Sequence, residues 1–382
     1  MKKYDYIIIG AGIAGCSLSY FLKKESKSIL LIDKNKDVAF GASGAAGAFL
    51  SPLLGKSNNF KTLVTEALKF STNIYKKEFS QFLDNCGTCR IPKNKDEDNK
   101  FQSYIPFMDF EFEKFEDGYF FKVGSTIKPY EICKALSSDV EKLFDYEVLK
   151  IEQEDDFWII NNEIKANKLF LATGADISLI SEPYFDIRAV WGQKIDVKTS
   201  TKVDINYHKE CSLSKSHNCI VSIGATHNRF SEDMSDSSYN LKLKNINLID
   251  HNEKTLQIMK NDTKELLEKA NSIKKLEDIE LLDVKIGARA SSVDYFPMLG
   301  LLVDSKKSFE KYPHIKNGTH IKNENLEVIK NLYTLNGVGG RGFVLSLYLA
   351  HNLVENILRD KKLDENITNF RLFSRWAKRQ KA

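Results

Sequence analysis

The first residues of the chain hold the pattern that most restricts its fold. Ile7, Ile8 and Ile9 form a continuous apolar run, typical of a strand buried on both faces of a parallel sheet. The glycine-rich segment Gly10-Ala11-Gly12-Ile13-Ala14-Gly15 follows at once, and apolar residues then recur at helical spacing. A second apolar run, 29–32, ends at Asp33. This order predicts a strand, a tight turn, a helix and a parallel strand.

Each part of this unit has a physical role in binding a dinucleotide. Gly10 permits the tight turn, Gly12 lets the backbone approach a pyrophosphate, and Gly15 lets the helix pack on the strand. The helix N-terminus offers free N–H groups and a positive dipole to phosphates, and Asp33 can bind ribose hydroxyls. The alternative is a glycine turn in an unrelated parallel-sheet protein. The unit alone does not choose between NAD and FAD.

Small residues dominate a second segment, 41–48, which includes Ala42, Ser43, Gly44 and Gly47. Such residues suit a backbone that lies close against a flat ligand. A linker is the alternative, but linkers are usually polar throughout, and this segment continues into the apolar residues 49–54.

The middle of the chain alternates between two kinds of pattern. Apolar spacing predicts a helix over 61–82, and alternating aromatic and polar residues predict antiparallel strands over 91–125. Further strands are expected at 146–151, 157–160 and 168–171, the last ending at Ala172-Thr173-Gly174. From 188 to 290 we expect an antiparallel sheet with loops, a polar stretch over 231–245 and a helix near 255–272.

A third glycine segment lies near the end of the chain. A short strand over 332–335 leads into Asn336-Gly337-Val338-Gly339-Gly340-Arg341-Gly342, and a helix is expected from Phe343. A glycine turn that feeds a helix N-terminus can hold a second electron-rich group. The oxygen-bearing edge of a flavin, which becomes anionic on reduction, is such a group.

Composition excludes several classes of protein. Lys and Arg total 56 and Asp and Glu total 52, so the net charge of +4 excludes a chain-wide basic coat for nucleic acid but not a local basic patch. The apolar run 38–55 holds glycines and Pro52, so no membrane segment is expected. With no signal-peptide pattern, the six cysteines are predicted to be reduced thiols of a cytoplasmic protein. Cys86 and Cys89 lack the partners of a zinc site, so no metal is predicted.

Taken together, these segments resemble the D-amino-acid-oxidase-like (DAO) family of FAD-dependent oxidoreductases, which includes glycine oxidase and sarcosine oxidase. The resemblance is closest to the branch formed by the FAD-dependent half of tRNA-modifying MnmC proteins. The motifs that carry it span most of the chain and are the segments 41–54, 188–193, 223–226, 287–300, 337–342 and 370–376. The chain departs from the branch at Trp191-Gly192-Gln193, where Arg-Gly-Gln is usual, and at Gly339-Gly340-Arg341-Gly342, where Gly-Ser-Arg-Gly is usual. From the sequence we expect no methyltransferase half.

The resemblance implies a mixed α/β fold in which a Rossmann-like FAD-binding domain is interleaved with an antiparallel-sheet substrate domain. The expected FAD-binding domain comprises 1–84, 141–187 and 290–382, and the substrate domain comprises 85–140 and 188–289. The expected cofactor-binding residues are Gly10, Gly12, Ile13, Ala14, Gly15, Asp33, Lys34, Ala42, Ser43, Gly44, Gly47, Val148, Ala172, Thr173, Gly174, Gly337, Gly339, Gly340, Arg341 and Gly342.

The resemblance also implies a reaction, the removal of the carboxymethyl group from 5-carboxymethylaminomethyl uridine at the tRNA wobble position. The products would be 5-aminomethyl uridine and glyoxylate, with a separate methyltransferase acting on the former. Arg289 matches the arginine that binds the substrate carboxylate in relatives, and a structural ion pair is its alternative. Arg341 is expected at the site, on flavin, substrate or a structural carbonyl. Trp191 and Gln193 are candidates to line the substrate face, with core packing as the alternative for Trp191.

Two other functions fit the same sequence. One is a small-molecule amine oxidase acting on glycine, sarcosine or a D-amino acid, and the other is a non-catalytic flavoprotein. No general base stands out, because His208, His217 and His227 occur singly. For tRNA, the tail offers a basic patch around Trp376 made of Arg371, Arg375, Lys378, Arg379 and Lys381, with a solvated terminal helix as the alternative.

Overall fold

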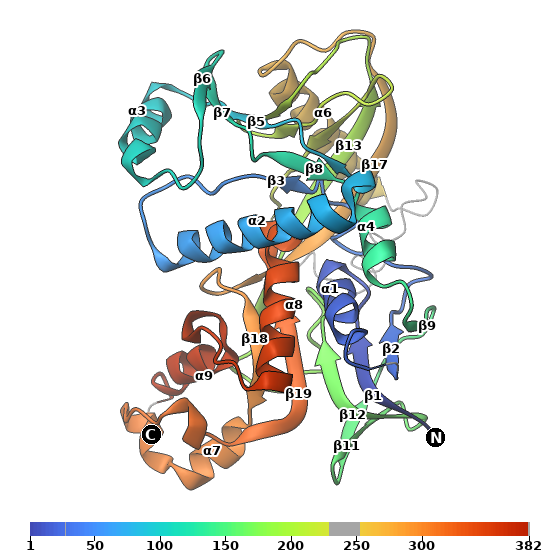
Figure 1. The fold of residues 1–382 in the computed structure, drawn as a ribbon, viewed down its shortest axis with the longest axis vertical. Helices are drawn as coiled ribbons and strands as arrows, with labels where there is room; N and C mark the ends of the chain where they lie inside the picture. Colours follow the sequence, from blue (N-terminus) through green and yellow to red (C-terminus); the bar gives the residue numbers. More distant parts are fainter. Residues whose placement is uncertain (27, 229–252, 381–382) are drawn as a thin grey trace.

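The fold is built on two large sheets. The computed structural model describes residues 1–26, 28–228 and 253–380, and within that part of the chain one sheet holds the glycine-rich unit while the other is mostly antiparallel. Figure 1 shows the first sheet beside α1 and α8, and the second sheet, with β13 and β17, above it. The predicted mixed α/β fold is confirmed.

The first sheet has a parallel centre in the order β12-β1-β2-β9, and β19 also pairs in parallel with β12. Its parallel strands are β1 (Lys2–Ile9), β2 (Ile29–Ile32), β9 (Glu141–Leu143), β12 (Ile164–Leu171) and β19 (Val328–Asn336). Its antiparallel members are β10 (Ile151–Glu154), β11 (Phe157–Ile160) and β18 (Met298–Val303). All four residues of β2 are buried, as expected for a strand covered on both faces.

The strand register aligns the carboxyl ends of the central strands. Ile9 pairs with Ile32 on one side and with Leu171 on the other, and Leu171 pairs with Thr334. The three glycine-bearing segments that follow these strands therefore leave the sheet at one edge. In open α/β sheets, ligands bind in the crevice outside this edge.

Helices cover both faces of the first sheet. On one face, α1, whose residues are all buried, packs against α4 and α8, and α2 packs against α8. On the other face, Phe309 of α7 and Phe373 and Trp376 of α9 join a second apolar cluster. These helices are α1 (Ile13–Leu22), α2 (Asn59–Glu78), α4 (Pro129–Leu136), α7 (Ser305–Lys311), α8 (Gly342–Arg359) and α9 (Asn369–Ala377).

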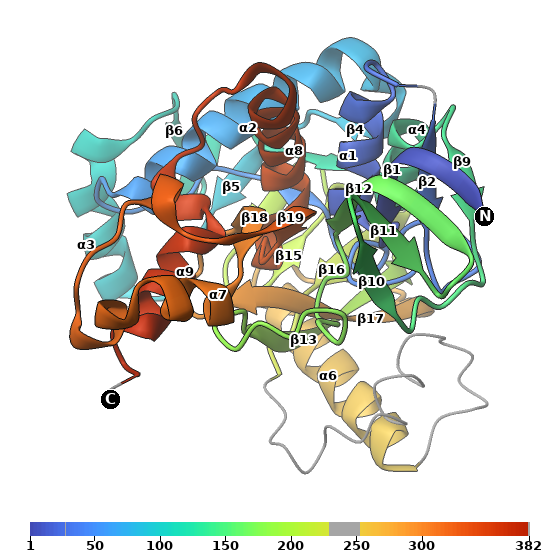
Figure 2. The same cartoon turned by 90° about the horizontal axis from the view of Figure 1, so that it is seen from below.

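The second sheet runs in the order β17-β13-β16-β15-β14-β5-β7-β6, and only β5 and β14 pair in parallel within the described ranges. Its strands are β5 (Thr88–Arg90), β6 (Glu113–Phe115), β7 (Gly118–Phe121), β13 (Ile187–Lys198), β14 (Asn206–His208), β15 (Ser212–Leu213), β16 (Ile220–Gly224) and β17 (Glu280–Ser292). Helix α6 (Glu253–Asn271) packs on β13 and β16 and lies outside the sheet in Figure 2.

Small elements complete the described part of the chain. A three-stranded sheet joins β3 (Phe49–Leu50), β8 (Ser125–Ile127) and β4 (Leu83–Asp84). The remaining helix is α3 (Lys95–Tyr104), and the short 3-10 turns are η1 (Ser80–Phe82), η2 (Ile105–Phe107), η5 (Pro313–Asn317), η6 (Asn323–Asn325), η7 (Gly339–Arg341) and η8 (Glu365–Ile367). No helix within 1–26, 28–228 or 253–380 has the length and apolar character to cross a membrane.

Two of the predicted elements differ from the structure. The segment 146–150 is not a strand, and β10 begins only at Ile151. The backbone of residues 146–150 is hydrogen-bonded to other segments. Tyr146 N–H donates to the Asp33 carbonyl, and the Leu149 and Lys150 N–H groups donate to the Asn161 side chain.

The charged residues 95–104, predicted as strand, form α3 instead. Asn94 accepts a hydrogen bond from Glu97 N–H as the N-cap, and acids in the first turn favour the positive end of the helix dipole. The helices predicted near 61–82, 255–272 and from 343 are confirmed. The predicted polar stretch 231–245 lies outside the described residues.

Candidate functional site

A cavity of about 1060 Å³ opens at the carboxyl edge of the first sheet and extends to the second sheet. This volume is at the upper end of the range for small-molecule sites. The predicted cofactor-binding residues that line it are Gly10, Gly12, Ile13, Ala14, Asp33, Lys34, Ala42, Ser43, Gly47, Val148, Ala172, Thr173, Gly174, Gly337, Gly339, Gly340, Arg341 and Gly342. Arg289 lines the same cavity.

Two predicted residues do not line the cavity, and their role in the structure is packing. A Cβ at Gly15 would collide with the Gly10 carbonyl oxygen, so Gly15 lets α1 approach β1. A Cβ at Gly44 would collide with the Ala39 carbonyl oxygen, so Gly44 closes the small-residue loop on itself.

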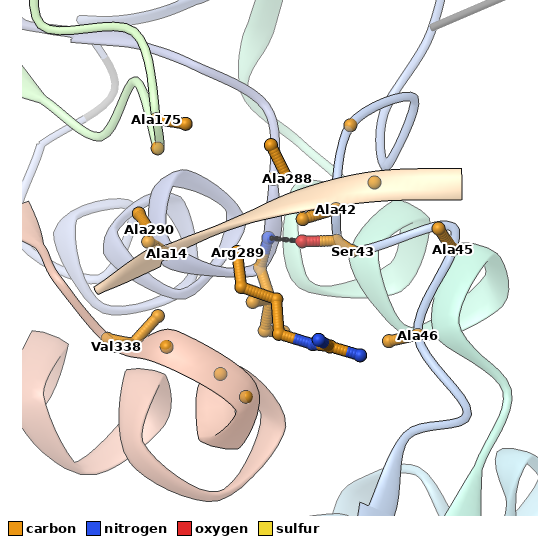
Figure 3. Close-up of a pocket in the computed structure, with 18 of the residues that line it drawn as sticks. Ala14, Ala42, Ser43, Ala45, Ala46, Ala175, Ala288, Arg289, Ala290 and Val338 are labelled. Atoms are coloured by element: carbon orange, nitrogen blue, oxygen red, sulfur yellow. Dashed lines mark hydrogen bonds between the residues drawn. The ribbon is translucent and has the colours of Figure 1, made fainter. Parts of the chain in front are cut away.

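The N-terminus of α1 faces the cavity and suits an anion. Gly12 is its N-cap, and no acid lies in the first turn. The Ser43 Oγ accepts a hydrogen bond of 2.9 Å from Ile13 N–H, as Figure 3 shows, and its own hydroxyl proton remains available to a ligand. Helix N–H groups and a hydroxyl donor together form a phosphate-binding arrangement.

Asp33 is held at the end of β2 by its neighbours. Its Oδ2 accepts a hydrogen bond from Ala11 N–H at 2.7 Å, and its Oδ1 accepts from the backbone and side chain of Asn35 at 2.8 and 2.7 Å. A carboxylate has about four acceptor positions, so capacity remains for sugar hydroxyls. The carboxylate is fixed where the turn after β1 and the turn after β2 meet.

Lys34 joins two loops at the same edge. Its Nζ contacts Asp176 at 2.8 Å and Glu147 at 3.5 Å, and so links the segment after β12 with the segment that carries Val148. Burial alone would raise the pKa of Asp176, but hydrogen bonds from Lys34 and Ser178 lower it to about 2. Lys34 therefore orders the wall beside Asp33.

Asn336 connects the third glycine segment to the segment that follows β12. Its Nδ2 donates to the Gly174 carbonyl at 2.9 Å, and its Oδ1 accepts from Gly337 N–H at 2.8 Å. Gly337 has φ +70°, a left-handed conformation that favours glycine, and η7 then leads into α8. The N-terminus of α8, like that of α1, therefore opens onto the cavity with no acid in its first turn.

Arg289 extends into the cavity from β17, among small residues of the facing loops (Figure 3). Its Nη1 donates to the Thr226 carbonyl at 3.1 Å, and burial lowers the pKa of its guanidinium. Gly192 makes room for it, because a Cβ at Gly192 would collide with the guanidinium. Among the described residues Arg289 has no carboxylate partner, so the alternative of a structural ion pair is not supported.

Arg341 lies in η7 and has both a structural contact and a free side. Its Nη1 donates to the Ser51 carbonyl at 3.2 Å, and burial lowers its pKa to about 10. The guanidinium lines the cavity, and most of its five N–H donors remain for a ligand.

Among the further residues that line the cavity, three carry a guanidinium or an imidazole and were not predicted to lie there. Arg90 ends β5, His208 ends β14 and is paired in register with Arg90, and His227 follows β16. Burial and the charges of Arg90 and Arg341 lower the pKa of His208 to about 3, and burial followed by the charge of Arg289 lowers that of His227. Both imidazoles are therefore neutral near pH 7. No motif marks Arg90 or His208, which meet only through strand pairing, whereas His227 directly follows the motif 223–226.

Comparison with known proteins decides the family. The family model described as "DAO: FAD dependent oxidoreductase" matches residues 5–356. The chain belongs to this family. It is an FAD-dependent oxidoreductase, as predicted.

The named relatives fall into two groups. The tRNA 5-methylaminomethyl-2-thiouridine biosynthesis bifunctional protein MnmC of Campylobacter fetus subsp. fetus is 22% identical, over 93% of this chain and 56% of the relative. The MnmC protein of Leptospira borgpetersenii serovar Hardjo-bovis is 26% identical, over 92% of this chain and 56% of the relative. The chain thus spans about half the length of these relatives. Among solved structures, glycine oxidase from Bacillus cereus has a TM-score of 0.70 at 18% identity, over 94% of this chain and 96% of that one. Iminodiacetate oxidase from Chelativorans has a TM-score of 0.67 at 14% identity, over 95% and 99%.

The cavity fits the FAD of the family. The N-terminus of α1 with Ser43 would hold the pyrophosphate, Asp33 the ribose next to adenine, and the turn η7 the flavin end. Small side chains leave the floor open, and a Cβ at Gly287 would meet the Ala42 Cα at 2.7 Å, so the loop and β17 approach closely. These assignments to single residues are proposals.

Several other candidates have roles away from the cavity. Trp191 lines the cavity, as one of its two predicted roles requires, but Gln193 does not. The Nε2 of Gln193 instead donates hydrogen bonds to the Met259 carbonyl and to Thr263 Oγ1, and so anchors α6. His217 pairs with Asp84 outside the cavity. Burial raises the pKa of Cys86 to about 11 and that of Cys89 to about 12, and all six cysteines are free thiols.

Only part of the predicted basic patch is exposed. Arg371 is bound by Asp294, with Nε–Oδ2 and Nη2–Oδ1 distances of 3.0 Å, so its expected phosphate contact is replaced by an ion pair. Trp376 packs against Tyr184, Phe309 and Phe373. The side chains of Arg375, Lys378 and Arg379 are exposed, and Lys381 lies outside the described residues.

Proposed function

We propose that this oxidoreductase removes the carboxymethyl group from 5-carboxymethylaminomethyl uridine at the tRNA wobble position. The products would be 5-aminomethyl uridine and glyoxylate. Support comes from similarity over more than nine-tenths of the chain to MnmC proteins, whose name states tRNA 5-methylaminomethyl-2-thiouridine biosynthesis. A methyltransferase acting on the product is the proposed partner, and the cytoplasm is the proposed location.

The observation that carries the proposal is Arg289. It is a guanidinium that opens into the cavity, beside the turn proposed for the flavin, with one backbone carbonyl as its partner. A planar guanidinium binds a carboxylate through two charge-assisted hydrogen bonds. The Cδ of Arg289 lies 3.7 Å from where a Cβ on Gly340 would be, so the arginine and η7 are adjacent. A carboxylate held there lies next to the flavin end of the cavity.

The chemistry required of the protein is mainly positioning. FAD, when bound, supplies the two-electron acceptor. Arg289 would hold the carboxylate and so orient the carbon between it and the amine nitrogen. Oxidation of that C–N bond gives an imine, and water hydrolyses the imine to glyoxylate and the primary amine. His208 and His227, neutral because burial lowers their pKa values, leave the amine region without an extra positive charge from imidazolium.

A second candidate is oxidation of a free amine such as glycine or sarcosine. The observation that favours it is the same open guanidinium, which would hold the carboxylate of a free amino acid equally well. The two candidates differ in what extends from the amine nitrogen, which is a nucleotide in one case and a hydrogen or methyl group in the other.

Anaerobic flavin bleaching in the purified FAD-loaded protein tests the proposal. The protein is mixed with tRNA that carries the carboxymethylaminomethyl group, and separately with glycine and with sarcosine. We expect bleaching by the tRNA, with 5-aminomethyl uridine in the digest. Bleaching by the free amino acids alone would contradict the tRNA proposal and favour the second candidate.

Arg289→Gln should raise KM for the active substrate at least about tenfold, because a charge-assisted pair is removed. Arg289→Lys should recover part of that loss. Arg188→Gln is the matched control, because Arg188 is an exposed arginine of β13 that does not line the cavity. An unchanged KM in Arg289→Gln would show that the carboxylate binds elsewhere.

A further inference from the structure

The cavity holds more positive charge than one carboxylate requires. Arg90, Arg289 and Arg341 all line it, from β5, β17 and η7. Among the described residues, none of the three guanidiniums forms an ion pair, and their protein hydrogen bonds are one backbone carbonyl for Arg289 and one for Arg341. Most of their N–H donors therefore have no acceptor within the described residues.

Arg90 is the least satisfied of the three. Its Nε is buried and has no hydrogen-bond partner within the described ranges. Buried polar groups are normally hydrogen-bonded, and a charged donor without an acceptor is especially costly. The charge of Glu97 acts on Arg90 and raises its pKa, but burial and the charge of Arg341 outweigh that effect. The arginine is thus arranged for an acceptor that the described part of the chain does not provide.

Arg90 and Arg341 form a like-charged pair across the two halves of the molecule. Burial, followed by the charge of Arg341, lowers the pKa of Arg90 to about 10, so the two guanidiniums are close enough to repel. Arg90 comes from the mostly antiparallel sheet, and Arg341 comes from the turn that follows the first sheet. An anion between them would relieve the repulsion.

Arg289 has different neighbours from Arg90 and Arg341, although it lies beside η7. Its charge acts on His227, whereas Arg90 and Arg341 both act on His208, which pairs in register with Arg90. Arg289 donates to Thr226 after β16, and Arg341 donates to Ser51 after β3. Arg289 is therefore held by different groups from those that hold Arg341.

We propose that Arg90 and Arg341 form a second anion-binding subsite, so that the substrate is an amine carrying two anionic groups. This inference rests on the proposed function, in which Arg289 binds the carboxylate next to the reacting carbon. The second group is an oxyanion, either a phosphate of the wobble nucleotide or the far carboxylate of a free diacid. The nucleotide is the occupant that agrees with the proposed substrate.

Binding of non-oxidisable ligands to the holoenzyme tests the subsite without turnover. The dissociation constant is read from the shift in the absorbance of bound flavin. One pair of probes is 5-carboxymethyluridine and its 3′,5′-bisphosphate, and the other is methoxyacetate and diglycolate. The bisphosphate adds two phosphates to the nucleoside, and diglycolate adds one carboxylate to methoxyacetate. Within each pair the ratio of the two dissociation constants therefore measures the gain in affinity from the added anionic groups, and its loss in an Arg90 variant assigns that gain to the second subsite.

In the wild-type protein, we expect the bisphosphate to bind at least about tenfold more tightly than the nucleoside. Arg90→Gln should abolish that ratio, whereas Arg289→Gln should weaken both probes and preserve it. Arg90→Lys keeps the charge but removes the planar donors, so it should retain part of the ratio. It also replaces Arg90→Gln as the test variant if Arg90→Gln does not retain FAD. Arg188→Gln should behave as wild type, since Arg188 lies outside the cavity.

The outcomes separate the subsite from the proposed substrate. If Arg90→Gln removes only the advantage of diglycolate over methoxyacetate, the subsite stands and its occupant is a small diacid, which contradicts the nucleotide substrate. If both ratios survive in Arg90→Gln and Arg90→Lys, the subsite proposal is wrong. If tRNA bleaches the flavin but the ratios of dissociation constants are unchanged in the Arg90 variants, the proposed function stands and Arg90 has no role in anion binding.

Discussion

At the scale of single residues, the position of Arg289 depends on the absence of two side chains. Gly192 and Gly287 are directly opposite each other on β13 and β17. A Cβ on Gly192 would collide with the Arg289 guanidinium, whereas a Cβ on Gly287 would press on the backbone of Ala42. One glycine therefore makes room for the arginine proposed to bind the substrate, and the other lets the loop of the proposed cofactor site approach.

This difference gives opposite expectations for two alanine variants. Gly192→Ala should raise KM for a carboxylate substrate by about tenfold while FAD binding is kept, because the displaced atoms are the end of a flexible side chain. Gly287→Ala should instead weaken FAD binding, since backbone atoms must move. Steady-state kinetics and FAD titration measure the two effects. In an Arg289→Gln background, Gly192→Ala should add nothing, and an added loss there would refute the explanation.

The sequence identifies some of these residues and not others. Arg289 can be predicted because its position matches the arginine that binds the substrate carboxylate in relatives, and the glycine turns can be predicted because their spacing has a direct physical cause. Arg90 escapes prediction because a single arginine at the end of a three-residue strand has no pattern. Its position depends on the pairing of β5 with β14 and β7, which the sequence does not show.

At the scale of elements, α6 supports the site through a buried carboxylate. Asp262 accepts hydrogen bonds from Thr226 Oγ1 at 2.9 Å and from Asn228 Nδ2 at 2.7 Å. The Thr226 carbonyl in turn accepts from Arg289. Burial raises the pKa of Asp262, and these two hydrogen bonds oppose that rise. The helix thus orders the segment after β16 that holds Arg289.

Removing this carboxylate should affect both stability and binding. Asp262→Ala leaves two donors without an acceptor, so we expect the free energy of unfolding to fall by about 1–3 kcal/mol. We also expect a higher KM, because Thr226 is less well held. Glu268→Ala is the control, since Glu268 is 68% exposed on the same helix and should change the free energy of unfolding by less than about 0.5 kcal/mol. Denaturant unfolding measures the change in the free energy of unfolding, and steady-state kinetics measure the change in KM. Equal effects of Asp262→Ala and Glu268→Ala would contradict the supporting role of Asp262.

Element prediction succeeds where the pattern and the local chemistry agree. The strands around the glycine turns and the helices α2, α6 and α8 follow from apolar spacing. The failure at 146–150 has a tertiary cause, because those backbone groups bond to Asp33 and Asn161 rather than to a strand. At 95–104, the N-cap Asn94 and the acids behind it favour a helix more strongly than the alternation of residues favours a strand.

At the scale of the whole molecule, the chain crosses repeatedly between the two sheets. Strands of the first sheet lie within 2–32, 141–171 and 298–336, and strands of the second lie within 88–121 and 187–292. The domain boundaries expected from the sequence remain our proposal. The family resemblance supplies the order of these crossings, which strand periodicity alone does not determine.

The exposed end of the molecule gives a prediction about tRNA. If Lys378 and Arg379 neutralise phosphates, their joint replacement by Gln should weaken tRNA binding, and the slope of log K against log salt should become shallower by about 0.7–0.9 for each phosphate left unpaired. Arg371→Gln should instead lower the free energy of unfolding by about 1–3 kcal/mol with the salt dependence unchanged, since Arg371 is paired with Asp294. Titrations at several salt concentrations test this. An unchanged slope in the double variant would exclude the tail from the tRNA interface.

The alignment of β1, β12 and β19 also bears on how the protein is made. Synthesis proceeds from the N-terminus, yet the third glycine segment follows β19, which ends at Asn336. Asn336 is also the residue that bonds to Gly174 in the wall after β12. During synthesis the two edges of β1 are covered by β2 and β12, but residues 169–171 of β12 keep an unpaired edge until β19 has emerged. The cavity is lined in part by residues after β19, so we expect FAD to be captured only once that segment has been made.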